Sequence, residues 1–220
     1  MANSKSATSL NDSASLMWRL QMYGSGALPS LMEELCIQAA PAAERPGPAF
    51  RDSHAALAFA VAADDQSMAR MMDGLRAAAD KGDKLASEVT LPLVQGISAF
   101  VHQDYGEAVR LMEPLFGQDA RYDQLARIGG SHAQREVFED TLVEAYLRAG
   151  QFEKAEVLLS QRLRRRESPR DAFWLARAQE ADGNREAAAA SIQQSRDAWP
   201  DADPDSQEIA SLTKLADRVG

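Results

Sequence analysis

Apolar and small residues follow a helical-hairpin pattern in the C-terminal part of the chain. Between residues 136 and 200, two copies of this pattern begin about 33 residues apart, close to the period of about 34 residues that is typical of tetratricopeptide helix pairs. Each copy has two amphipathic segments joined at a glycine, Gly150 in the first and Gly183 in the second. Pro200, which lacks an N–H group, ends the second copy. The pattern predicts stacked helical hairpins.

The pattern returns, less regularly, in most of the remaining chain. Upstream helical segments are expected over residues 12–22, 29–40, 54–63, 68–79 and 85–117. The clearest repeats cover residues 89–117, 136–168 and 169–200, and an amphipathic helix over 204–219 is expected to cap the last repeat. Each hairpin buries its apolar side only against its neighbours. Residues 11–220 are therefore predicted to form one domain, a right-handed α-solenoid of about five tetratricopeptide-like hairpins plus the C-terminal capping helix.

Proline, glycine and short polar residues mark the breaks between these helices. Three prolines within residues 41–50 predict a loop, after which Asp52 is expected to be the N-cap of the next helix. Residues 118–130 form an irregular connection, with a short helix expected over 121–128. Asp203 is expected to cap the last helix. The Ser-rich residues 1–10 are expected to be a disordered tail.

Composition supports a helical, globular protein and narrows the classes of partner. Hydrophobic residues make up 45% of the chain and charged residues 26%, and abundant Ala with few Thr and Val favours helix over strand. The net charge of −9 argues against nucleic acid as a partner, because nucleic-acid binding needs a basic face. No membrane span is expected, since no run of about 18 apolar residues occurs. The lone Cys36 and the lack of an apolar secretory signal near Met1 predict a cytoplasmic location.

Three further segments have sequences that the repeat pattern does not require. They read SASLMWRL over residues 13–20, FRDSHA over 50–55 and IGGSHAQREVF over 128–138. In this order they resemble signatures of the tetratricopeptide-repeat-protein-38-like family. The chain resembles only the C-terminal half of the longer family members. The resemblance implies an α-solenoid of helical hairpins, and it brings no catalytic residue set with it.

The last of these segments contains the strongest candidate for a polar site. The candidate ligand-binding residues, taken from all three segments, are Trp18, Asp52, His54, His132 and Arg135. His132 and Arg135 can bind an anionic or polar ligand, on which an indole ring can stack. Ser131 and Gln134 have a structural alternative, because S-x-x-Q spacing is that of a capping box. Capping requires neither His132 nor Arg135, so both interpretations stay open for these two residues.

Other chemistry-bearing residues favour structural roles. The histidines His54, His102 and His132 do not stand at i, i+3 or i+4 spacing, so no metal site is predicted. Cys36 lies in an apolar helical segment and is interpreted as a small apolar residue, with a nucleophile as the alternative. No phosphate-binding loop or dinucleotide fingerprint is present, and no cofactor is expected. The basic run 162–166 is interpreted as a solvated helix end, with a site for an acidic peptide as the alternative.

A curved stack of hairpins has a concave face, on which the first helix of each pair is expected to lie. By similarity to tetratricopeptide proteins, the residues expected to face this groove are Phe100, Asp140, Glu144, Phe173, Arg177 and Glu180. Phe173 beside Arg177 is suited to anchor a peptide through an aromatic and a charged contact. This hypothesis requires Phe173 to be exposed.

Two classes of function are consistent with these observations. The first is a non-enzymatic scaffold that binds a protein segment or peptide on its concave face, an argument by analogy with the architecture. The alternative is a small-molecule-binding or divergent enzymatic protein whose polar site lies around His132, Arg135, Asp52 and His54. A homodimer is a further hypothesis, since an amphipathic terminal helix can mediate self-association.

Overall fold

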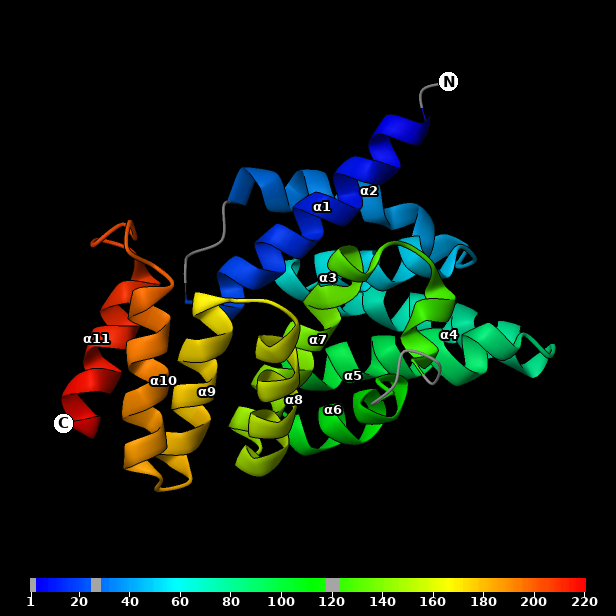
Figure 1. Cartoon of the computed structure of the whole chain (residues 1–220). Coiled ribbons are helices and arrows are strands. Elements are labelled where there is room, and N and C mark those ends of the chain that lie inside the picture. The colour runs from blue at the N-terminus through cyan, green and yellow to red at the C-terminus, as the bar shows by residue number, and fades with distance from the viewer. Residues whose placement is uncertain (1–2, 25–28, 118–122) are drawn as a thin grey trace. The chain divides into compact units, whose positions relative to one another are not determined.

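The described part of the chain, residues 3–24, 29–117 and 123–220 of a computed structural model, is entirely helical (Figure 1). The α-helices are α1 (Asn3–Met22), α2 (Pro29–Glu44), α3 (Ala49–Ala62), α4 (Asp65–Asp80), α5 (Leu91–Val101), α6 (Tyr105–Met112), α7 (His132–Arg148), α8 (Phe152–Arg165), α9 (Pro169–Ala181), α10 (Arg185–Asp197) and α11 (Gln207–Val219). Shorter elements are the π-helix η1 (Ala86–Thr90) and the 3₁₀ helices η2 (Glu113–Leu115) and η3 (Gln124–Ile128). The predicted all-α class is confirmed. No helix among the described residues is long and apolar enough to cross a membrane.

The chain divides into two compact units, Met1–Leu142 and Val143–Gly220, with the boundary inside α7. The sequence predicted a single domain over residues 11–220. Each unit has one helix at its centre. In the first unit α3 packs against α1, α2 and α5, and residues 52–61 are buried without interruption. In the second unit α9 packs against α8, α10 and α11, with residues 171–176 buried.

Within the described residues, the same turn joins four pairs of α-helices, α3 to α4, α5 to α6, α7 to α8 and α9 to α10, and it also occurs at Gly82, between α4 and η1. One or two residues after the end of each first helix, a residue has a positive φ; these residues are Ala63, Gln103, Gly150 and Gly183. The next backbone N–H then donates to the carbonyl five residues earlier. These bonds run from Asp64 to Phe59 (2.9 Å), Asp104 to Ala99 (2.9 Å), Gln151 to Tyr146 (2.9 Å) and Asn184 to Gln179 (2.8 Å). This is the Schellman arrangement, which satisfies carbonyls at a helix end.

Three of these turns also start the following helix. The side chains of Asp64, Asp104 and Asn184 each accept a hydrogen bond from the backbone N–H three residues later, at 3.0, 3.1 and 3.2 Å. A single residue therefore ends one helix and caps the next. This arrangement leaves no room for a longer loop and folds the two helices of each pair against each other.

Several helix boundaries differ from the expected ones because packing outweighs local signals. α2 continues through Pro41 to Glu44, although a loop was expected over residues 41–50. Ala42 and Ala43, just after the proline, are 1% and 5% exposed, and their burial compensates for the missing N–H bond. α3 then begins at Ala49, so Asp52 lies in its first turn and the expectation that it is the N-cap was wrong.

The two ends of the chain show similar differences. α1 begins at Asn3, so residues 3–10, expected to be disordered, are helical, and Leu10 is 2% exposed. α11 begins at Gln207 with Ser206 as its N-cap, in place of the expected Asp203. Residues 118–122 of the irregular connection lie outside the described part of the chain, and the short helix expected over 121–128 is the 3₁₀ helix η3.

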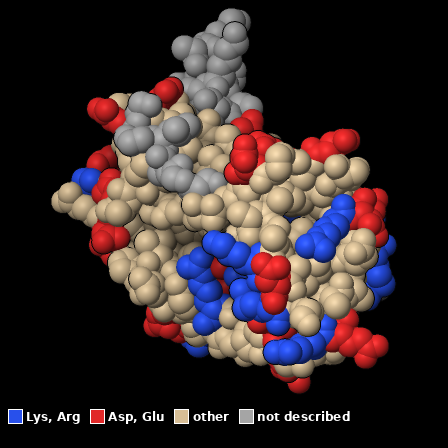
Figure 2. All heavy atoms as spheres, turned by 90° about the vertical axis from the view of Figure 1, so that its left-hand side faces the viewer, with Lys and Arg blue, Asp and Glu red and all other residues tan. Residues whose placement is uncertain are grey.

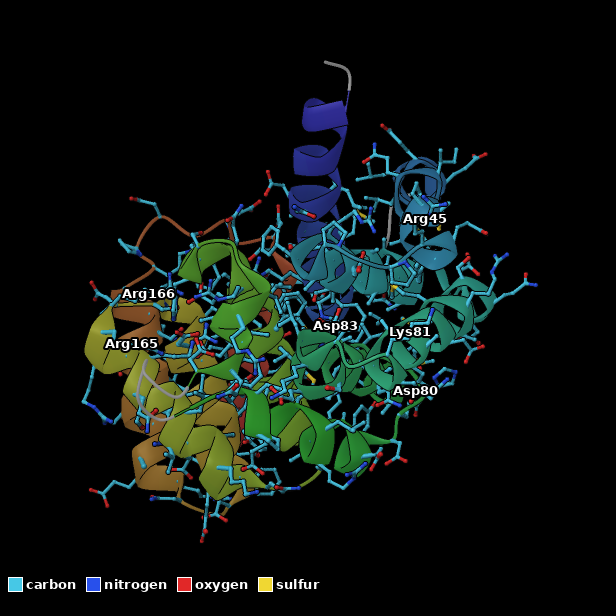
Figure 3. All side chains as sticks on the ribbon, turned by 90° about the vertical axis from the view of Figure 1, so that its right-hand side faces the viewer. Arg45, Asp80, Lys81, Asp83, Arg165 and Arg166 are labelled. Carbon is cyan, nitrogen blue, oxygen red and sulfur yellow. The ribbon has the colours of Figure 1, made fainter. Side chains whose placement is uncertain are left out.

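A buried ion pair joins α8 to α9 in the second unit. Arg162, in the last turn of α8, donates from Nε and Nη2 to the carboxylate of Asp171, at 3.1 and 3.0 Å. Both side chains are under 5% exposed, so Arg162 is not part of a solvated helix end. Only the rest of the basic run, Arg164–Arg166, is exposed, and Figure 3 labels two of these arginines.

Removing one partner of this pair should destabilise the second unit. We expect Asp171→Ala to lower the free energy of unfolding by about 3 kcal/mol, because the guanidinium of Arg162 would remain buried without its carboxylate. Urea denaturation followed by circular dichroism measures the change. The matched control is Asp217→Ala in α11, an exposed aspartate, which should change stability by less than about 0.5 kcal/mol. Equal losses in the two variants would contradict a stabilising role for the pair.

Candidate functional site

The indole of Trp18 is part of the core of the first unit. Its Nε1–H donates to Thr141 Oγ1 of α7 at 2.8 Å, and Thr141 in turn donates to the carbonyl of Val137 at 2.8 Å. The ring lies 5.5 Å from the ring of Phe100, centroid to centroid, and is 2% exposed. Trp18 therefore holds α1 against α7 and presents no face on which a ligand can stack.

Asp52 fastens a loop to α3. Its carboxylate accepts hydrogen bonds from the backbone N–H of Gly47 at 2.6 Å and from Arg51 Nη2 and Nε at 2.7 and 3.0 Å. Burial raises the pKa of Asp52, and the bonds from Arg51 and Gly47 act in the opposite direction. Because the side chain is fully buried, these contacts are structural.

His54 lies between two phenylalanine rings of the first unit. Its Nδ1–H donates to the carbonyl of Phe50 at 2.7 Å, and the ring centroids of Phe50 and Phe138 are 4.4 and 5.2 Å away. Burial lowers the pKa of His54, while the backbones of Phe50 and Gln134 and the carboxylate of Asp12 raise it less strongly. The imidazole is 1% exposed and fills the space between α3 and α7.

The turn before α7 contains the predicted capping box. Ser131 N donates to Gln134 Oε1 at 2.9 Å, and Gln134 N donates to Ser131 Oγ at 3.3 Å. The structural interpretation of these two residues is confirmed. Arg135 closes the same turn, because its Nη1 donates to the carbonyls of Gly129 and Gly130. His132 is exposed at the start of the helix.

The five candidate ligand-binding residues thus have different environments. Trp18, Asp52 and His54 are buried with structural partners, Arg135 holds a turn, and His132 faces solvent. Of the polar cluster predicted for a ligand, Trp18 and His54 belong to the contact between α1, α3 and α7. Sequence spacing alone does not reveal this, because polar residues buried with hydrogen-bond partners resemble a binding site in their composition.

Other candidate chemistry in the described residues is also limited. No three His, Cys, Asp or Glu side chains gather there in a way that could hold a metal ion. Burial raises the pKa of the half-buried Cys36 thiol, with the nearby charge of Asp64 as a smaller cause. An open depression of about 330 Å³ lies among α4, α5 and α6 and includes His102, Glu107 and Arg110; it contains none of the candidate site residues.

Most residues expected to face a groove are buried. Phe100, Asp140, Glu144 and Phe173 are 5%, 4%, 3% and 8% exposed. The hypothesis that Phe173 anchors a peptide was therefore wrong, because the ring packs inside the second unit. In the first unit, Asp140 accepts from Arg19 Nε at 2.8 Å. Of the six predicted residues, only Arg177 and Glu180 keep part of their side chains in solvent.

Those two residues belong to a row of ion pairs across α7, α9 and α11 of the second unit. Glu144 accepts from Arg148 Nε at 2.9 Å and from Arg177 Nη1 and Nη2 at 2.8 and 3.3 Å. Glu180 accepts from Arg218 Nε at 3.0 Å. The sequence analysis selected Glu144, Arg177 and Glu180 as candidate residues but did not reveal that they form ion pairs. Glu144 and Arg177 stand 33 residues apart, which is one repeat.

The glycine turn gives a test of the contact between α3 and α7. A Cβ atom on Gly130, whose φ is +72°, would overlap the ring of Phe50, whereas one on Gly150, whose φ is +70°, would meet nothing within 4 Å. Both alanine substitutions should cost about 1 kcal/mol for the left-handed backbone. Gly130→Ala should lose about 1–3 kcal/mol more from overpacking, measured by urea denaturation. Equal losses would show that the Phe50 contact is unimportant.

Burial of His54 predicts a pH dependence of stability. Because its pKa in the folded state lies below the unfolded value of 6.5, the unfolded state binds more protons as the pH falls. Neutral His54 should contribute its full stabilisation above the pKa of histidine in the unfolded state. This stabilisation should be lost as the pH falls through the pKa of His54 in the folded state. Free energies of unfolding measured between about pH 8 and pH 5 should fall less steeply in His54→Gln than in the wild type. Parallel curves for the two proteins would contradict this prediction.

No protein-family model matches the chain, and no solved structure is significantly similar to it. The similarity of residues 13–20, 50–55 and 128–138 to tetratricopeptide-repeat-protein-38-like signatures therefore stays a prediction from sequence. In the structure, residues from all three segments contribute to the contact between α1, α3 and α7.

Proposed function

We propose that this chain is a non-enzymatic scaffold, a right-handed α-solenoid of tetratricopeptide-like hairpins, which binds a segment of another protein. The recurrence of one turn at four helix pairs supports a repeat architecture. Repeat proteins of this kind offer an extended surface made by equivalent helices of successive hairpins. In the second unit, the equivalent first helices are α7 and α9, followed by α11.

The observation that carries the proposal is the partly exposed row of charged residues on these helices. Arg170, in the first turn of α9, pairs with Glu208 in the first turn of α11 at 3.4 Å. Near the other ends of the same helices, Glu180 pairs with Arg218. α9 and α11 therefore run parallel, as successive first helices of stacked hairpins do. Figure 2 shows basic groups with acidic ones beside them on the side of the molecule where α10 and α11 lie.

The row is suited to a protein segment because it is long, polar and only partly exposed. It extends over three helices, and its side chains are ordered by their mutual ion pairs, so little side-chain entropy would be lost on binding. The alternative of a small-molecule or enzymatic site has less support. Its candidate residues Trp18, Asp52 and His54 are already occupied by buried contacts.

Charge reversal on the row should remove a bound protein. We expect Arg218→Glu to lose a partner that the wild-type chain captures from native lysate, because like charges would face each other beside Glu180 and the partner's contact with the guanidinium would disappear. Quantitative mass spectrometry of the captured proteins measures the loss. The matched control is Arg110→Glu, since Arg110 is similarly exposed and pairs with Glu107 in the first unit. If no protein is captured selectively, or if both variants capture the same proteins, the proposal fails.

A further inference from the structure

The ion pairs on α7, α9 and α11 all point their arginines outward. Arg148 and Arg177 are 37% and 33% exposed, above a Glu144 carboxylate that is 4% exposed. Arg218 is 57% exposed against 26% for Glu180. Arg170 is 37% exposed against 19% for Glu208. In each of these pairs the arginine side chain is therefore the more exposed partner, and the glutamate lies deeper.

These ion pairs leave some guanidinium N–H donors available for a ligand and fix the direction in which the donors point. Arg177 uses Nη1 and Nη2 to bind Glu144, and Arg218 uses Nε and Nη2 to bind Glu180. A guanidinium has five N–H donors, so each of these two arginines keeps N–H groups for a further acceptor. The carboxylate beneath each guanidinium holds its plane in place, which favours hydrogen bonds to planar carboxylates.

We propose that the protein segment bound by this face is acidic and extended, with carboxylates at intervals of three residues. The inference rests on the proposed scaffold function and names the chemistry of its partner. Arg170 and Arg177 stand seven residues apart on α9, which corresponds to about 10.5 Å along the helix. A polyproline II segment repeats its side-chain direction every three residues, or about 9.3 Å. Acidic residues at that interval can therefore meet both arginines from one side.

The charge of the whole chain favours a short acidic segment over a long polyanion. The net charge is −9, so a nucleic acid that extends beyond the arginines is repelled by the remaining surface. A short peptide places its carboxylates only where the guanidinium groups are, and its affinity should fall as salt increases.

The test uses a capped synthetic peptide of about 12 residues in the polyproline II conformation, with Glu at every third position and Pro and Ser between. Two comparison peptides carry the same residues with the glutamates consecutive, or Gln in place of Glu. Fluorescence anisotropy with the full chain at low salt measures binding. We expect the spaced peptide to bind several-fold more tightly than the clustered one and the Gln peptide not to bind.

Variants of the arginines then identify the surface. Arg177→Gln should weaken binding of the spaced peptide about tenfold, as expected for loss of a charge-assisted hydrogen bond, and Arg110→Gln should leave it unchanged. Arg218→Gln is the second variant, because this more exposed residue is less important for folding. Circular dichroism checks that each variant is folded. Unchanged affinity in both variants, equal binding of the Gln peptide, or tighter binding of a single-stranded oligonucleotide of similar length would overturn the inference.

Failure of this inference can be distinguished from failure of the scaffold proposal. If a protein captured by the wild-type chain is retained by both Arg177→Gln and Arg218→Gln, the scaffold function stands and the acidic partner is wrong. If the spaced peptide binds in an Arg177-dependent way but no protein is captured selectively, the surface is correctly described and the scaffold function fails.

Discussion

Chain reversal at a left-handed residue is the constraint on which the rest of this structure depends. At Ala63, Gln103, Gly150 and Gly183 the backbone adopts a positive φ, and the next N–H returns to a carbonyl five residues earlier. Each turn therefore ends one helix and begins another with only two or three residues between them. In the second unit the turn at Gly183 reverses the chain between α9 and α10, and residues 198–206 lead it back into α11. The first turns of α9 and α11 form one ion pair and their last turns another, so the charged row depends on both reversals.

Buried polar groups have a different role in the first unit. A buried hydrogen-bonding group is costly without a partner, and Trp18, Asp52 and His54 each have one. The bond from Trp18 joins α1 to α7, whereas those of Asp52 and His54 hold the loop before α3 and the first turn of α3. The same residues look like a ligand site in the sequence because binding sites and structural networks use the same donors and acceptors. Burial is what separates the two interpretations, and burial depends on tertiary contacts.

Local signals in the sequence predicted the helices and the turns well. Gly150 and Gly183 mark two of these four reversals, and the capping box at Ser131 and Gln134 forms as expected. The errors arise where long-range packing decides. Pro41 does not end α2, because the alanines after it are buried. Phe173 is buried, so spacing alone did not identify which side of α9 faces solvent. The ion-pair partners of Glu144 and Glu180 come from other helices, which spacing within one helix cannot reveal.

On the proposed function, the face of α7, α9 and α11 that carries the exposed arginines is a binding surface for an acidic protein segment. Hydrogen–deuterium exchange of the wild-type chain, with and without the spaced acidic peptide at saturation, tests it most directly. Binding at this face should slow exchange in the last turns of α7 and along α9 and α11, with no change in α4 to α6, where the open depression lies. Protection confined to α4 to α6, or no protection anywhere at saturation, would contradict it.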